Sequence, residues 1–361
     1  MRHMPFKADC LPLYLGSLPE MDDQKALDLV MAYSPAIPNW SQMPGGDKRE
    51  GMVAQFAAGL PGLRRRKGSL YVDNLDAAFQ DEMLRFYEAY LGAAPHPAVL
   101  DDDLFALSPE TARGFFAFME RIDGLVEAPR AVKGQITGPF TFGTGIKDPS
   151  GVAIFHDDVL RDMVLKLLCM KARWQLEQLT AKGYPVILFI DEPALAGFGT
   201  SEYITVSRET IVDCLAEMVG AIHDAGGLSG IHVCANTDWS MVMETGADLI
   251  SFDAFSYFDR LILYQDALVD FMNAGNWLAW GIVPTVRPED IEKETVISLA
   301  GQFRRKLESL LALGIDRAVV LEQSLITPSC GTGTLSPGYS ERVFRLTKGV
   351  SDHIRREEHY A

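Results

Sequence analysis

Short runs of apolar and β-branched residues recur along the chain, and most of them are apolar on both faces. Parallel strands that are covered by helices have this pattern, because both faces of each strand are buried. The runs predict eight strands, LPLYLGS (11–17), AIPNWSQ (36–42), AVKGQIT (131–137), PVILFID (185–191), SGIHVCA (229–235), ADLISFDA (247–254), WLAWGIV (277–283) and DRAVVLEQS (316–324).

Longer amphipathic stretches follow most of these runs and predict helices over 156–183, 206–226 and 288–314. Each stretch ends at a glycine, the residue that most readily follows the last turn of a helix, and Ser207 is the expected N-cap of the second. Between the second and third strands we expect a long helical insertion, roughly 51–125. Its basic run, Arg64 to Lys67, is expected to be a solvent-exposed turn.

The alternation of strands and helices predicts an α/β fold with a parallel sheet. Eight strands predict a closed (β/α)8 TIM barrel, here a single domain over residues 1–361 with a helical insertion between strands two and three. An open, Rossmann-like sheet is the alternative, but no Gly-x-Gly-x-x-Gly motif follows the first expected strand. In a barrel of this kind, chemistry lies at the C-terminal ends of the strands.

Composition and charge narrow the classes of function. Apolar residues make up 48% of the chain and charged residues 23%, as in ordinary globular proteins. The net charge of −16 disfavours a nucleic-acid partner and docking on an anionic membrane. The N-terminus lacks a signal-peptide pattern, and no run of about 18 apolar residues occurs, so a cytoplasmic location is expected.

The five cysteines divide into two kinds. Their odd number in a long chain argues against a disulfide scaffold. Cys169 and Cys214 lie in expected helices, where a cysteine is usually a buried, inert thiol. Cys234 and Cys330 lie instead at expected strand ends, close to other residues that bind metals.

A histidine, two cysteines and a carboxylate gather at the expected mouth of the barrel. His232 and Cys234 are two positions apart on the fifth strand, so they point to the same side. Asp253 ends the sixth strand, and Cys330 follows the eighth. Because zinc prefers imidazole and thiolate ligands, this set predicts a zinc site. The alternative is a hydrogen-bonded core histidine beside a small buried cysteine.

Other polar residues follow the first and fourth strands. Asp191 and Glu192 precede Pro193, a pattern that either caps the next helix or aims a carboxylate at a cationic group in the mouth. Ser17 lies in a tight turn after the first strand. The glycines between 137 and 145 would let a ligand approach the backbone.

Taken together, these motifs resemble the catalytic barrel of cobalamin-independent methionine synthase. The wider group includes the uroporphyrinogen decarboxylase-like barrels and the methylcobalamin:coenzyme M methyltransferases. The resemblance extends over nearly the whole chain, and the motifs occur in the order of the family. They are Leu15-Gly16-Ser17, Thr137-Gly138-Pro139, the run Ile190 to Leu195 (IDEPAL), His232-x-Cys234 and Pro328-x-Cys330-Gly331.

The resemblance implies a zinc ion held by His232, Cys234, Cys330 and a carboxylate. The family uses a glutamate for that carboxylate, and the matching residue here is the shorter Asp253. The resemblance further implies that a zinc-bound thiol accepts a methyl group, with homocysteine, which gives methionine, as the leading acceptor.

The resemblance also implies a substrate site. Ser17 and Asp191 match the residues that the family uses for homocysteine, and Glu192 stands beside them as a further substrate-binding residue. Asp191 is the expected catalytic residue.

Several departures from the family bear on the methyl donor. Gly145 and Gly197 replace two folate-contacting residues, and Gly46 or Asp47 replaces a glutamate that contacts the homocysteine amine. The stretch 233–352 contains no histidine that would donate a proton to folate. We therefore expect a methylated corrinoid as donor, either methylcobalamin or a corrinoid protein. Cobalt leaves as a stable ion, and no general acid is needed.

Three other functions remain open at this point. The acceptor is alternatively a thiol of the coenzyme M type, without an amine. The chain is alternatively a metal-free decarboxylase of the uroporphyrinogen type, or a zinc barrel that binds a corrinoid protein without turnover. A decarboxylase would need arginines at the mouth to hold the carboxylates of its substrate.

Overall fold

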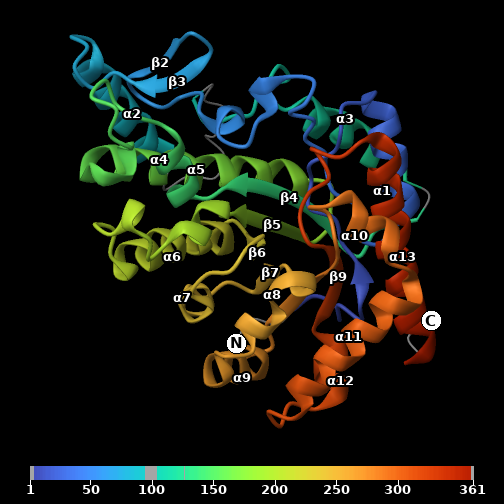
Figure 1. Ribbon diagram of the computed structural model, residues 1–361. Helices are drawn as coiled ribbons and strands as arrows, with labels where there is room; N and C mark the ends of the chain where they lie inside the picture. Colours follow the sequence, from blue (N-terminus) through green and yellow to red (C-terminus); the bar gives the residue numbers. More distant parts are fainter. Residues whose placement is uncertain (1–3, 94–103, 126, 359–361) are drawn as a thin grey trace.

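The protein is built around a curled sheet of seven parallel strands, in the order β1-β9-β8-β7-β6-β5-β4 (Figure 1). The structure is a computed structural model that describes residues 4–93, 104–125 and 127–358. The strands are β1 (Leu11–Pro12), β4 (Val132–Thr137), β5 (Val186–Asp191), β6 (Leu228–Val233), β7 (Leu249–Phe252), β8 (Trp277–Val283) and β9 (Ser324–Pro328).

Six of the eight predicted strands are confirmed at their positions. Every residue of β4, β5, β6, β7 and β8 is buried, which explains why these strands are recognisable as mainly apolar runs, although β4 and β6 also contain buried polar residues. The first strand is shorter than predicted, because only Leu11–Pro12 pairs regularly with β9.

The predicted strand over 316–324 is wrong. Arg317–Glu322 forms helix α12, and the strand follows it as β9. The carboxylate of Asp316 accepts a hydrogen bond from the backbone N–H of Ala318 (2.8 Å) and so caps this helix. A short apolar run fits either type of element, and here the N-cap favours the helix.

Segment 36–42 forms isolated bridges and no regular strand. Asn39 pairs in parallel with Lys133 of β4, and Gln42 pairs with Ser17. Pro38 has no N–H to give to a ladder, which limits regular pairing here. The segment nevertheless makes backbone contacts with both edges of the sheet.

Helices cover the outer face of the sheet. The described helices are α1 (Asp23–Tyr33), α2 (Phe79–Ala93), α3 (Arg113–Ile122), α4 (Pro139–Gly145), α5 (Asp158–Thr180), α6 (Arg208–Asp224), α7 (Trp239–Glu244), α8 (Ala254–Leu261), α9 (Gln265–Asn273), α10 (Pro288–Lys293), α11 (Val296–Leu311), α12 and α13 (Pro337–Glu357). Short 3-10 helices are η1 (Lys48–Glu50), η2 (Ala54–Phe56), η4 (Ile154–His156), η5 (Pro193–Gly197) and η6 (Ser201–Tyr203).

Two of the three predicted helices are confirmed as single helices. α5 and α6 match 156–183 and 206–226, and Ser207 caps α6 through the N–H of Thr210 (3.1 Å). The third prediction, 288–314, is divided into α10 and α11, because Thr295 and Ser298 form a capping box that starts a new helix.

The insertion is mixed, and not helical as predicted. An antiparallel hairpin of β2 (Leu63–Arg66) and β3 (Ser69–Val72) precedes α2, and Figure 1 shows both elements away from the sheet. Its turn has positive φ at Lys67 and Gly68, as hairpins with two-residue turns favour. The expected exposed basic turn is confirmed for this tip, although Arg64 pairs with Glu82 (2.8 Å).

Both apolar and polar side chains are buried on the strands of the curled sheet. Apolar side chains such as Leu11, Ile187 and Trp277 fill one part of it. Polar residues are also buried on these strands: Lys133 near the start of β4, Gln135 in its middle, and His232 near the C-terminal end of β6. Among the described residues, no helix is long and apolar enough to cross a membrane.

Candidate metal centre

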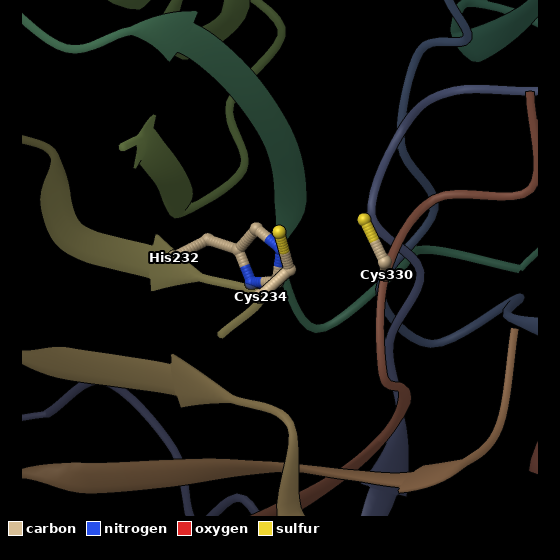
Figure 2. Close-up of side chains that lie close together, drawn as sticks. All are labelled: His232, Cys234 and Cys330. Atoms are coloured by element: carbon tan, nitrogen blue, oxygen red, sulfur yellow. The ribbon is translucent and has the colours of Figure 1, made fainter. Parts of the chain in front are cut away.

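His232, Cys234 and Cys330 come together at the C-terminal ends of the strands (Figure 2). Their ligand atoms all lie within 4.8 Å of one another. His232 lies on β6 and Cys234 directly follows it, whereas Cys330 follows β9, which is separated from β6 by β7 and β8. The curl of the sheet therefore brings this set together from distant strands.

The imidazole of His232 is fixed on one side and unpaired on the other. Its Nδ1 lies 2.9 Å from the hydroxyl of Ser251 on β7, and its Nε2 is buried with no hydrogen-bond partner. A buried polar atom without a partner costs about 1–3 kcal/mol. A metal ion at Nε2 would remove that cost, and Ser251 would orient the ring as outer hydrogen bonds do in metal sites.

The two cysteines shift one another's pKa in opposite directions. The neighbouring Cys330 thiol lowers the pKa of Cys234, and His232 acts in the same direction. The proximity of Cys234 raises the pKa of Cys330. A metal ion held by both sulfurs would take them as thiolates and displace the protons that they carry.

This donor set fits zinc. Zinc–sulfur bonds of about 2.3 Å in a tetrahedral site place two thiolates about 3.8 Å apart, which is compatible with ligand atoms that all lie within 4.8 Å of one another. One imidazole and two thiolates supply three ligands and leave a position for an exchangeable group, as catalytic zinc sites do. Small side-chain movements suffice to complete the geometry.

Asp253, the predicted carboxylate ligand, does not join the group. Its carboxylate accepts from the N–H of Ser256 (2.8 Å) and caps α8, and burial raises its pKa to about 6. The side chain is one methylene shorter than a glutamate, and the cap bond holds it at the helix. In the described part of the chain, the cluster therefore has three members.

A cavity of about 290 Å³ opens over the cluster. Ser17 and Asp191, both predicted substrate residues, line it together with the three metal-binding residues. The other lining residues are Leu15, Gln42, Pro44, Glu50, Met52, Pro193 and Gly331. A larger hollow of about 650 Å³ between α2, α5 and α6 contains no such cluster.

The turn that carries Ser17 is tied to the loop that carries Cys330. The N–H of Thr332 donates to the carbonyl of Ser17 (2.8 Å). A Cβ atom at Gly331 would lie 2.0 Å from the Ser17 hydroxyl oxygen, so only glycine fits there. The Cys330-Gly331 motif thus reflects the close approach of these two segments.

Asp191 lies at the end of β5, paired in register with His232 on β6. It is 8% exposed, and burial raises the pKa of its carboxyl, while the charge of Lys133 acts in the opposite direction. Its place between the cluster and the cavity is the one predicted for a substrate-binding carboxylate.

Glu192, which we predicted to bind substrate, faces α4. Its carboxylate accepts from the N–H groups of Phe140 (2.9 Å) and Thr141 (2.8 Å) and from the Thr141 hydroxyl (2.6 Å). Glu192 is fully buried and does not line the cavity. The predicted cap on the next helix is not found, because Glu192 makes no side-chain bond to the start of η5 and binds the start of α4, whereas Asp191 lines the cavity.

Glu50 is a cavity residue that the sequence did not indicate. It is buried, its Oε1 accepts from Arg113 (2.7 Å), and its Oε2 accepts from the N–H of Met43 (2.8 Å). From the sequence we expected no carboxylate here, because Gly46 or Asp47 replaces the glutamate that contacts the homocysteine amine in the family that the motifs resemble. The polar run around Glu50 resembles an exposed loop, and only the fold brings it inward.

The two positions that replace folate-contacting residues are closed by neighbours. A Cβ atom at Gly197 would meet the ring of Tyr203 at 2.7 Å, and one at Gly145 would meet Val53 at 3.1 Å. Larger side chains are therefore disfavoured at both positions.

A scan against protein-family models finds no family that matches this chain, and a search of curated proteins finds no match. A candidate function is therefore inferred from the geometry of the site and from the motifs.

Proposed function

We propose that this chain is a zinc-dependent thiol methyltransferase, similar to cobalamin-independent methionine synthase. It would move a methyl group from a methylated corrinoid to a zinc-bound thiol, with homocysteine as the leading acceptor. The observation that carries the proposal is the convergence of His232, Cys234 and Cys330 at a cavity that also holds carboxylates.

The proposal includes a closed (β/α)8 barrel. Segment 36–42 bridges to Ser17 on one side and to β4 on the other, and so takes the eighth position around the ring. Backbone hydrogen bonds from Lys133 to Pro38 (2.9 Å) and from Gln42 to Gly16 (3.0 Å) support this closure. The site then lies where barrels of this class carry their chemistry.

His232, Cys234 and Cys330 would hold the zinc ion. Zinc, when bound, would lower the pKa of a substrate thiol, so that a thiolate exists at neutral pH. Ser251 holds the imidazole in place, and the two cysteine ligands keep the bound thiolate electron-rich and nucleophilic.

The transfer itself is a displacement at the methyl carbon. The substrate sulfur forms a bond to that carbon as the donor's bond to it breaks, and the bonding pair leaves with the donor. With cobalt as the leaving atom, no proton is needed. Among the described residues that line the cavity, His232 is the one histidine, and it would be a zinc ligand, which agrees with such a donor.

Charge in the cavity distinguishes the two acceptors. Asp191 and Glu50 both line it, so an ammonium group near them gains two carboxylate partners. The sulfonate of coenzyme M would instead meet like charges. An amino-thiol such as homocysteine is therefore favoured over a thiol of the coenzyme M type.

A decarboxylase of the uroporphyrinogen type fits less well. Arginine is absent from the cavity lining in the described part of the chain. Arg49 pairs with Asp47, and Arg64 pairs with Glu82, both on the outside. The carboxylates of a porphyrinogen substrate would have no guanidinium partner at this mouth.

Methyl transfer is tested by following the absorbance of methylcobalamin after thiol is added to zinc-loaded protein. We expect homocysteine to accelerate demethylation, and coenzyme M to do so at least about tenfold less, because its anionic end meets carboxylates. If no thiol accelerates demethylation beyond the rate with protein lacking metal, the proposed function is wrong.

A further inference from the structure

A lysine is buried inside the curled sheet, beneath the metal centre. Lys133 on β4 is 0% exposed, and its Nζ donates to Oε1 of Gln135 (3.1 Å). The same Nζ lies 4.8 Å from the centre of the Phe189 ring. The described residues offer Lys133 no ion pair with a carboxylate, although isolated buried charges are strongly disfavoured.

Strand geometry puts this ammonium group under the cavity. Side chains two apart on a strand point to the same side, so Phe189 lies directly below Asp191 on β5. The register pairs Gln135 with Phe189 across β4 and β5. A Cβ atom at Gly16 would meet the Gln135 side chain at 2.9 Å, and Gly16 precedes the cavity residue Ser17.

The groups above Lys133 are mainly acidic, and of these Glu50 is already paired with Arg113 (2.7 Å). Asp191 and Glu50 line the cavity, and Cys234 and Cys330 would be thiolates when they hold a metal ion. Lys133 is the largest charge that lowers the pKa of Asp191, and Asp191 is the charge that raises the pKa of Lys133. The two groups thus interact through space although they do not touch.

We propose that Lys133 is a positioning residue that supplies a fixed positive charge beneath the site and thereby stabilises the anionic thiolate of the bound substrate. This inference rests on the proposed function for the identity of the substrate. The positive charge of Lys133 slightly opposes metal binding, because ammonium and zinc are both cations. The same charge favours the substrate thiolate that binds to the metal.

The chain contains a matched control. Lys171 on α5 is also almost fully buried, at 1% exposed, but its Nζ donates to the backbone carbonyls of Leu104 (3.3 Å) and Ala106 (3.1 Å). It belongs to the outer layer and does not line the cavity. Removing its charge removes a buried lysine without changing the field at the metal centre.

The test uses full-length protein loaded with Co²⁺, whose sulfur-to-metal absorption reports thiol binding directly. Lys133→Met retains the chain length and loses the charge. We expect its Kd for homocysteine to rise about tenfold relative to wild type. We expect release of Co²⁺ to a chelator to become slower, and Lys171→Met to match wild type in both measurements.

Equal homocysteine affinity and equal metal release in Lys133→Met and wild type would overturn the proposal and leave Lys133 as a packing residue. Lys133→Gln, which is neutral and keeps a hydrogen-bond donor, serves if the methionine variant does not fold. A wild type that takes no Co²⁺ or binds no thiol also overturns the proposal. Methyl transfer that fails in wild type, with the Kd contrast intact, overturns the proposed function alone.

Discussion

Single side chains at the metal centre are fixed by one partner each, which leaves their other atoms available. Ser251 binds one ring nitrogen of His232, while the other nitrogen has no partner. The sulfur atoms of Cys234 and Cys330 lie close to one another and to His232. Buried polar atoms without a hydrogen-bond partner are unfavourable in a core. In a preorganised metal site, however, such atoms are the ones that bind the metal.

Ser251→Ala is expected to weaken metal binding without removing a ligand. The ring of His232 would lose its orienting hydrogen bond, and second-layer losses of this kind typically reduce metal affinity about 10–100-fold. Competition with a chromophoric chelator measures the change. Unchanged affinity would mean that packing alone orients His232. The control is Ser351→Ala, a buried serine on α13 whose hydroxyl donates to the carbonyl of Cys10 (2.7 Å).

The two buried lysines predict a rise in stability with pH above about 8. Burial lowers the pKa of Lys133 and of Lys171 to about 8, from 10.5 in an unfolded chain. Between these values the unfolded state binds more protons, so the free energy of unfolding increases with pH, by about 1–3 kcal/mol per lysine up to pH 10.5.

Urea unfolding of wild type, Lys133→Met and Lys171→Met between pH 8 and pH 10 measures this dependence. Buried tyrosines titrate with the opposite sign at the upper end, so the difference between wild type and each variant is the relevant quantity. We expect each methionine variant to lose its part of the rise. An identical pH slope in all three proteins would show that neither lysine is proton-poor in the folded state.

Elements place the site through close backbone approaches. Glu192 reaches from the end of β5 to the first turn of α4, and Gly138 leaves room for it. Gly331 leaves room for Ser17 in the same way. The motifs around Gly138 and Gly331 therefore describe contacts between neighbouring strand ends, which makes them recognisable in sequence.

Gly138→Ala is expected to destabilise the protein by about 2–4 kcal/mol, because the new Cβ would lie 2.1 Å from the Glu192 carboxylate and break its bonds to α4. Gly220→Ala in α6 is the control. It has no atom within 4 Å of the new Cβ and should stabilise the helix by about 1 kcal/mol. Thermal unfolding of both variants checks this; equal Tm values would contradict the account.

Much of the fold could be predicted because buried parallel strands are apolar throughout, as in β5 and β8. The exceptions have local causes. Arg317–Glu322 is apolar enough for a strand, but Asp316 caps it as a helix. The strand β9 contains polar residues that are buried between β1 and β8, and its sequence alone does not indicate that environment.

The candidate site could be predicted in part, because some of its residues lie at the ends of recognisable strands. Residues at strand ends, such as His232 and Asp191, follow from the order of the strands. Glu50 could not be predicted, because it reaches the cavity from the loop before the hairpin and is held there by Arg113, more than sixty residues away. Its orientation depends on tertiary contacts of the insertion.

In the whole molecule, the sheet and the insertion together enclose the site. β6 and β9 supply the metal-binding residues, and the segment around Pro44, Glu50 and Met52 forms a wall of the cavity. The hydroxyl of Thr137 donates to the carbonyl of Met52 (2.5 Å) and fastens this wall to β4. The first part of the insertion thus belongs to the site, and a metal ion would link strands that do not otherwise meet.

The central claim is most directly tested by the zinc content of the purified protein, wild type beside Cys234→Ser, with Cys214→Ser as control. Cys214 is a buried thiol in α6 and does not line the cavity. The account predicts about one zinc per chain in wild type and in Cys214→Ser, and a loss of zinc in Cys234→Ser. A wild type that binds no zinc after reconstitution, or a Cys234→Ser variant that retains it fully, would contradict the account.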